Sequence, residues 1–166
     1  MSTEEFIIIV YLIIEEIYPT IVSEPLRKRG FPPALTDIEI ITMQIVGECL
    51  KMDTDKSIWM FFKNNYLSWF PHLGSYTNFC KHCANLWQVH QKITAQLTAH
   101  YGQDHIHFID GFPIPVCRYS RAKRHKNFKE HAGFSYCAAQ QEKYYGFKGH
   151  LVINLEGMIT GYTFAP

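Results

Sequence analysis

The most informative part of the chain is residues 105–117, with the sequence HIHFIDGFPIPVC. Residues 105–109 are rich in isoleucine and phenylalanine, which predicts a short β-strand. The carboxylate of Asp110 ends this apolar run, and a stretch punctuated by prolines follows it. A strand that exposes one carboxylate is a common way to hold a divalent metal, because hard cations prefer oxygen ligands. Asp110 is therefore the first candidate for a catalytic and metal-binding residue.

Two more strands are expected downstream of Asp110. Residues 144–154, YYGFKGHLVIN, form a second strand-like run, and the turn signal NLEG at residues 154–157 leads into a returning strand at 158–164. The intervening segment, residues 118–142, is polar and basic and has no clear period. These features predict an antiparallel sheet after residue 102.

The pattern before residue 102 is helical. Thr36 and Glu39 have the spacing of a capping box, which predicts a helix start. Apolar residues at intervals of three and four support helices over residues 4–18, 36–50, 54–65 and 75–101. Pro19 and Pro25 indicate a break after the first helix, and residues 27–30 a short basic turn.

The predicted fold class is α+β, with a domain boundary near residue 102. Residues 1–102 are expected to form a helical N-terminal domain, and residues 103–166 a sheet domain. The composition suits a globular core, since 47% of the 166 residues are hydrophobic and 15% are aromatic. With no secretory signal and an odd set of five cysteines, a reduced cytoplasmic setting is the expectation.

Charge is divided unevenly along the chain. Residues 1–50 hold eight acids and three bases, whereas residues 111–150 hold eight bases and two acids. The basic part suggests a polyanionic partner, although a solvated loop has the same composition. The densest stretch, residues 118–129, contains the candidate DNA-binding residues Arg118, Arg121, Lys123, Arg124, Lys126 and Lys129. Tyr119 and Phe128 in this stretch are suited to stacking on splayed bases.

Lys148 and His150 alternate along the second expected strand and therefore project from one face. If that strand pairs with the strand of Asp110, all three side chains are expected to point into one phosphate-binding site. The alternative is an ordinary solvent-facing strand. Both residues are candidate DNA contacts.

Two N-terminal patterns carry weaker signals. Cys80 and Cys83 have the spacing of a zinc half-site, but no second pair follows at finger distance, and packing inside a helix is favoured. The three helices from residue 36 onward have short connections, as in a helix-turn-helix unit, and many small helical domains look the same. DNA binding by residues 1–102 is therefore one hypothesis for this domain.

Several ordered motifs together resemble bacterial insertion-sequence transposases of the DDE class. They lie at residues 35–41, 53–56, 84–89, 110–117, 144–151 and 164–166. The resemblance covers nearly the whole chain. Gly111 stands where a serine is common in that family, and Gly149 where an apolar residue is usual.

The resemblance implies a ribonuclease H-like catalytic domain whose first strand bears Asp110 as the first of three catalytic acids. It also implies two-metal phosphoryl transfer with Mg²⁺, and DNA at transposon ends as the partner. The family's second Asp and final Glu would lie beyond residue 166, since only Glu130, Glu142 and Glu156 follow Asp110. The expectation is therefore a truncated transposase, an incomplete domain over residues 103–166 that binds Mg²⁺ weakly and is inactive by itself.

Two other functions remain open. A non-catalytic DNA-binding fragment would occupy transposon ends or inhibit the full enzyme. An unrelated small α+β protein would use Asp110 only structurally. In the truncated form, an unpaired strand edge is expected to promote self-association or homo-oligomers.

Overall fold

The computed structural model describes residues 1–24, 26–27, 30, 32–102 and 104–166. It divides into two compact units, Met1–Gln96 and Leu97–Pro166, which are described separately below. The expected break at Pro25 and half of the basic turn at residues 27–30, namely residues 28 and 29, lie outside the described residues. No helix among the described residues has the length and apolar character needed to cross a membrane.

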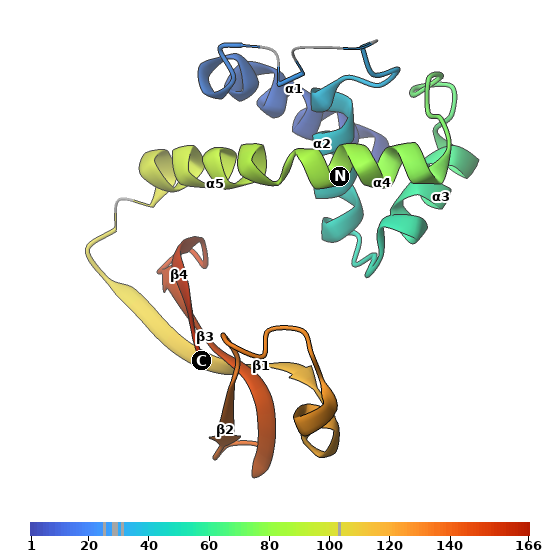
Figure 1. Ribbon diagram of the computed structural model, residues 1–166. Coiled ribbons are helices and arrows are strands. Elements are labelled where there is room, and N and C mark those ends of the chain that lie inside the picture. The colour runs from blue at the N-terminus through green and yellow to red at the C-terminus, as the bar shows by residue number, and fades with distance from the viewer. Residues whose placement is uncertain (25, 28–29, 31, 103) are drawn as a thin grey trace. The chain divides into compact units, whose positions relative to one another are not determined.

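Unit 1 is built from helices (Figure 1). Their bounds are α1 Thr3–Ile21, α2 Asp37–Cys49, α3 Asp55–Asn65, α4 Tyr76–Asn85 and α5 Trp87–Tyr101, the last of which runs into unit 2. Thr36 caps α2 through the predicted capping box, with the Glu39 carboxylate accepting from the Thr36 N–H at 2.7 Å. Thr54 and Ser75 cap α3 and α4. Local cap chemistry thus sets where these helices begin.

Two helix boundaries differ from the sequence prediction. Helix α1 continues through Pro19 to Ile21, because a proline in the last turn removes only one hydrogen bond. The single helix expected over residues 75–101 is interrupted at Leu86, whose N–H bonds to the Cys83 carbonyl three residues back. The apolar pattern is continuous across Leu86, so periodicity alone does not reveal the break.

The core of unit 1 lies between α1, α2, α3 and the α4–α5 segment. Phe62 is fully buried, and its ring packs edge-on against Phe70 with the ring centroids 5.2 Å apart. The buried apolar residues of the central helix α2 are Ile40, Ile41, Met43 and Val46.

Unit 2 contains a four-stranded antiparallel sheet organised around one long strand (Figure 1). Its elements are β1 His107–Cys117, the 3₁₀ helix η1 Tyr119–Arg124, β2 Gly133–Cys137, β3 Glu142–Asn154 and β4 Ile159–Ala165. Strand β3 pairs with β1 along one edge. Its other edge pairs with β2 over the first half and with β4 over the second. Helices followed by an antiparallel sheet confirm the α+β prediction.

Strand β1 is longer than predicted, since it continues past residue 109 through Pro113 and Pro115. The two prolines are two residues apart, so their nitrogens face the same edge. Among the described residues, β1 pairs only with β3, and prolines on an outer edge cost no ladder hydrogen bond. The segment 118–142, predicted to be irregular, contains η1 and β2.

Candidate functional site

The register between β1 and β3 decides which candidate side chains meet. Asp110 lies opposite Leu151, while Pro113 lies opposite Lys148 and Gly111 opposite His150. Directly opposed residues in an antiparallel pair project to the same face, and successive residues alternate between faces. Asp110 therefore projects from one face of the sheet, and Lys148 and His150 project from the other. The strands pair as expected, but the prediction of one shared site for all three side chains is wrong.

The face that carries Asp110, called the Asp110 face below, is otherwise almost entirely apolar. On β1 it includes Phe108, Phe112 and Ile114; on β3 and β4 it includes Phe147, Leu151, Ile153, Tyr162 and Phe164. Several of these rings are exposed, including Phe108, Phe112, Tyr162 and Phe164. A single carboxylate thus lies on an open apolar surface.

Gly149 explains how the Asp110 face is shaped. A Cβ atom at this position would lie 2.8 Å from the Phe112 ring and 2.9 Å from the Ile114 methyl. Since real contacts of this kind are essentially never so short, a larger residue would displace both side chains. The absence of a side chain at Gly149 thus lets Phe112 and Ile114 lie across β3.

The Asp110 carboxylate is exposed, and its Oδ1 accepts a hydrogen bond from the Gly111 N–H at 2.7 Å. No group of three or more histidine, cysteine, aspartate or glutamate side chains in the described part of the chain is arranged to hold a metal ion. Mg²⁺ usually keeps several waters and is held by one or two carboxylates together with substrate phosphates. Asp110 could therefore supply one ligand, and the described residues form no closed magnesium site around it.

The opposite face carries polar groups around Gly111. A Cβ atom there would lie 3.3 Å from Cε of Lys148 and 3.4 Å from Nδ1 of His150. Because Gly111 has no side chain, there is room above β1 for the side chains of Lys148 and His150. Lys148 is exposed and His150 is partly exposed, so both are accessible to an anion.

The basic segment, defined as residues 118–129, wraps into η1 and the turn after it. Ala122 is buried and anchors the short helix. The six cations of the basic segment are all exposed: Arg118, Arg121, Lys123, Arg124, Lys126 and Lys129. Throughout the described residues, no carboxylate lies within ion-pair distance of these cations. The segment therefore presents positive charge that is not neutralised internally.

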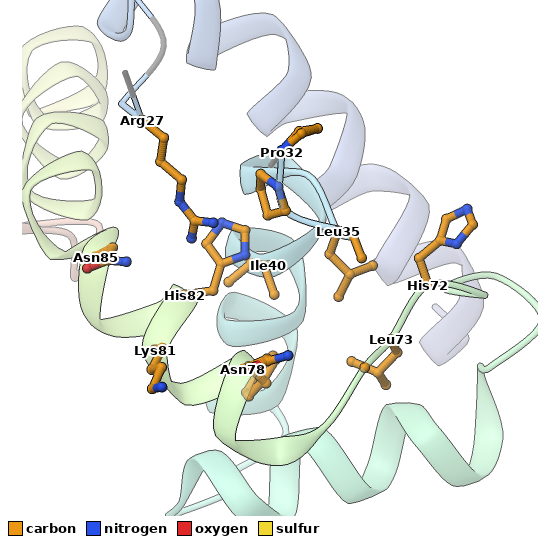
Figure 2. Close-up of a pocket in the computed structure, with 14 residues that line it drawn as sticks. Arg27, Pro32, Leu35, Ile40, His72, Leu73, Asn78, Lys81, His82 and Asn85 are labelled. Atoms are coloured by element: carbon orange, nitrogen blue, oxygen red, sulfur yellow. The ribbon is translucent and has the colours of Figure 1, made fainter. Parts of the chain in front are cut away.

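A separate pocket of about 460 Å³ lies within unit 1 (Figure 2). Its lining includes Arg27, Lys81, His72 and His82, and no carboxylate among the described residues lines it. Such a lining favours an anionic occupant.

A hydrogen-bonded network behind this pocket joins three parts of the sequence. Asp37 accepts from Nε2 of His82 at 2.5 Å and from the Tyr18 hydroxyl at 2.6 Å. The His82 hydrogen bond lowers the pKa of Asp37, aided by the Tyr18 hydroxyl and the charge of Arg27, and burial opposes this shift. Burial, followed by the hydrogen bond to Asp37, raises the pKa of Tyr18. Sequence patterns identified Asp37 only as part of a helix start, because no local pattern links Tyr18, Asp37 and His82, which lie far apart in the chain.

Cys83 is buried, and burial is the main cause that raises the pKa of its thiol to about 12. A protonated thiol is a poor metal ligand. This environment supports packing over the zinc half-site hypothesis for Cys80 and Cys83.

Comparison with known proteins gives a family for the C-terminal part of the chain. Residues 101–166 match the family model described as a transposase DDE domain. Neither a curated protein nor a solved structure was found to match the chain. Residues 101–166 are thus similar to transposase DDE domains, which confirms the resemblance to DDE-class transposases for that part of the chain.

Proposed function

We propose that the chain acts in DNA transposition, in metal-dependent cleavage and transfer of DNA strands, with Asp110 as one of the catalytic carboxylates. The observation that carries this proposal is the position of Asp110. It is a lone exposed carboxylate on an apolar sheet face, inside the segment that matches the transposase DDE domain. An isolated carboxylate in such a setting is a candidate functional group, since apolar faces are otherwise built for packing.

A ribonuclease H-like sheet is part of the proposal. Its support is the order of three strands, in which β1, β3 and β4 form consecutive antiparallel neighbours and the Asp110 strand lies at the outer edge. A further strand added beside β1 would lie next to Asp110. This arrangement leaves room for the remaining carboxylates to approach from outside the four strands.

We further propose that these 166 residues do not cleave DNA by themselves. Among the described residues, Asp110 is the one carboxylate on its face of the sheet, and no cluster of three or more potential metal ligands surrounds it. Incubation with duplex DNA and Mg²⁺ is expected to leave both strands intact on a denaturing gel. Metal-dependent nicking that disappears in Asp110→Asn would show instead that this polypeptide is sufficient.

A second candidate function is DNA binding without catalysis, by which the chain would occupy transposon ends or inhibit a complete enzyme. The exposed basic segment favours it, with Lys148 and His150 as further contacts on the opposite face of the sheet. The cationic pocket of unit 1 supports an additional phosphate contact in the helical domain. Self-association through the outer edge of β1 is proposed as well.

DNA binding is tested with duplexes from the ends of the element that encodes the chain, against scrambled duplexes. Fluorescence anisotropy at two salt concentrations is expected to show selective binding that weakens with salt, because phosphate contacts release counterions. Absence of binding to either duplex at low salt would reject both candidate functions.

The basic segment is tested by replacing Arg121, Lys123, Arg124 and Lys126 together with alanine. If each contacts one phosphate, the slope of log affinity against log salt should fall by about 3.6 for duplex DNA. Lys143→Ala is the matched control, since Lys143 is an exposed cation of the same unit outside the segment. An unchanged slope in the fourfold variant would exclude the segment as the DNA contact.

A further inference from the structure

The Asp110 face contains an open aromatic pocket that the transposase match does not assign. The pocket has a volume of about 570 Å³, and its lining is mainly apolar. Ile114, Phe147 and Phe164 contribute from the sheet, while His125, Asn127 and Phe128 contribute from the basic segment. Pockets of this size are typical for small ligands with flat apolar surfaces.

The backbone of Phe128 has an unusual conformation that hydrogen bonds hold in place. It adopts a φ of 57°, a left-handed conformation that is unusual for a bulky residue. Its carbonyl accepts hydrogen bonds from the N–H groups of His131 and Ala132, at 3.0 and 2.8 Å, and from the Tyr145 hydroxyl. Such a conformation persists only where the surroundings fix it, and it often occurs at ligand sites.

The ring of Phe128 is both supported and accessible. It packs edge-on against Phe147, with the ring centroids 5.7 Å apart, yet 56% of the residue remains exposed. By contrast, Tyr119 packs against Phe134 and does not line the pocket. Of the two aromatic residues in the basic segment, Phe128 is therefore the one presented to a ligand in this pocket.

The surroundings of the pocket indicate the charge of its occupant. Lys126 and Lys129 flank Phe128 in sequence, and both are exposed without a carboxylate partner among the described residues. An aromatic ring beside unpaired cations suits a nucleotide, whose base stacks while its phosphates are neutralised. Asn127 and His125 add polar groups that can bond to base edges.

The pocket and Asp110 lie on the same face of the sheet. Ile114 is four residues from Asp110 along β1, which corresponds to about 13 Å. Nucleotides of one strand in B-form DNA are about 3.4 Å apart along the helix axis, and more in an extended strand. The separation therefore matches a few nucleotides.

We propose that this pocket takes an unpaired DNA base close to the phosphate that faces Asp110. This inference rests on the proposed function and adds a substrate feature to it, namely a strand with at least one base out of the duplex stack. Phe128 provides the stacking surface, and the neighbouring lysines hold the strand.

The test compares two single-stranded oligonucleotides with the same phosphate backbone, one with normal bases and one with abasic sites throughout. Since their charges are equal, any difference in affinity reports the bases. The full chain is expected to bind the normal strand about tenfold more tightly, in the range of aromatic–base stacking. Phe128→Ala should abolish this preference, and Phe128→Trp should retain it.

Tyr136→Ala is the matched control, because Tyr136 has the same 56% exposure, lies in the same unit and does not line the pocket. Its preference for the normal strand should match that of the unmodified chain. DNA binding without any preference, or a preference that survives Phe128→Ala, would overturn the pocket proposal and leave the proposed function intact. If protein covers the pocket instead of a base, DNA binding should show no preference that depends on Phe128. Failure to bind either single strand would also overturn the pocket proposal, whereas the proposed function is decided separately by the duplex-binding experiment.

Discussion

The two units of this chain differ in how many apolar residues they bury. Among the described residues, sixteen of the nineteen buried apolar side chains lie in unit 1, and three lie in unit 2. Unit 1 also exposes apolar residues, such as Ile8 and Leu12 of α1, but it encloses a core around Phe62 between its helices. Unit 2 buries few large residues and leaves rings such as Phe108 and Phe164 exposed on an open sheet. The helical unit therefore has the packing that stabilises a domain, and the sheet unit has surfaces suited to further contacts.

The two units also differ in how they use a carboxylate, one for stability and the other for function. The half-buried Asp37 network in unit 1 joins α2 to α1 and α4. The exposed Asp110 in unit 2 has one hydrogen bond, to its own neighbour. A carboxylate that is fixed by two partners is suited to holding a fold together, while one that is accessible is suited to meeting a ligand.

The largest effect is expected from the core of unit 1. Phe62→Ala should lower the free energy of unfolding by about 3–5 kcal/mol, because it leaves a cavity in a closed core. The measurement is urea denaturation followed by tryptophan fluorescence, since Trp59, Trp69 and Trp87 all lie in unit 1.

The matching change in unit 2 is Phe164→Ala, at a residue that is 57% exposed. It should alter the free energy of unfolding, followed by circular dichroism, by no more than about 0.5 kcal/mol. Similar losses for Phe62→Ala and Phe164→Ala would remove the distinction between a closed and an open unit.

A smaller effect is expected from Asp37→Asn, which should cost about 2 kcal/mol through loss of charge-assisted hydrogen bonds. Because folding lowers the pKa of Asp37, its contribution to stability is present above the unfolded pKa of about 3.9. This contribution to stability is lost as the pH falls through the lower pKa that Asp37 has in the folded state. Unfolding monitored between neutral and acidic pH should therefore show a weaker acid dependence in the variant.

Asp53→Asn is the control for this experiment, since Asp53 is an exposed residue before the start of α3. It should leave both the stability and its acid dependence nearly unchanged. Equal effects of the two substitutions would assign the acid dependence to general charge rather than to the network.

The smallest effect is expected at the outer edge of β1, and it concerns self-association. Ile109 is 71% exposed and lies on β1 before Pro113 and Pro115, which have no N–H group for pairing. The unmodified chain should self-associate with increasing concentration in sedimentation velocity, and Ile109→Lys should reduce this by placing a charge on the edge. A monomer at all concentrations would refute the proposed edge pairing.

Local chemistry made much of unit 1 predictable. The capping box at Thr36 and the cap residue Ser75 place helix starts correctly, because the side chain and the N–H groups it satisfies are close in sequence. The break at Leu86 was not predictable, since it interrupts no pattern of apolar residues.

Long-range register limited the prediction for unit 2. Strand signals at Asp110 and at Lys148 identify two strands, but the face on which each side chain lies depends on their pairing. A shift of one residue exchanges the two faces, and Asp110 opposite Leu151 gives the arrangement that was not predicted. The aromatic pocket likewise requires the turn at Phe128 to fold onto the sheet.

If Asp110 faces bound DNA, removing its charge should change the affinity for DNA. In chelator, without divalent metal, a carboxylate beside a phosphate repels it by about 1 kcal/mol. Asp110→Asn should therefore bind duplex DNA about fivefold more tightly than the unmodified chain in fluorescence anisotropy. Glu156→Gln, which removes an exposed carboxylate from the β3–β4 turn, should have little effect. Equal affinities for the unmodified chain and Asp110→Asn would show that the Asp110 face does not meet DNA and would contradict the account.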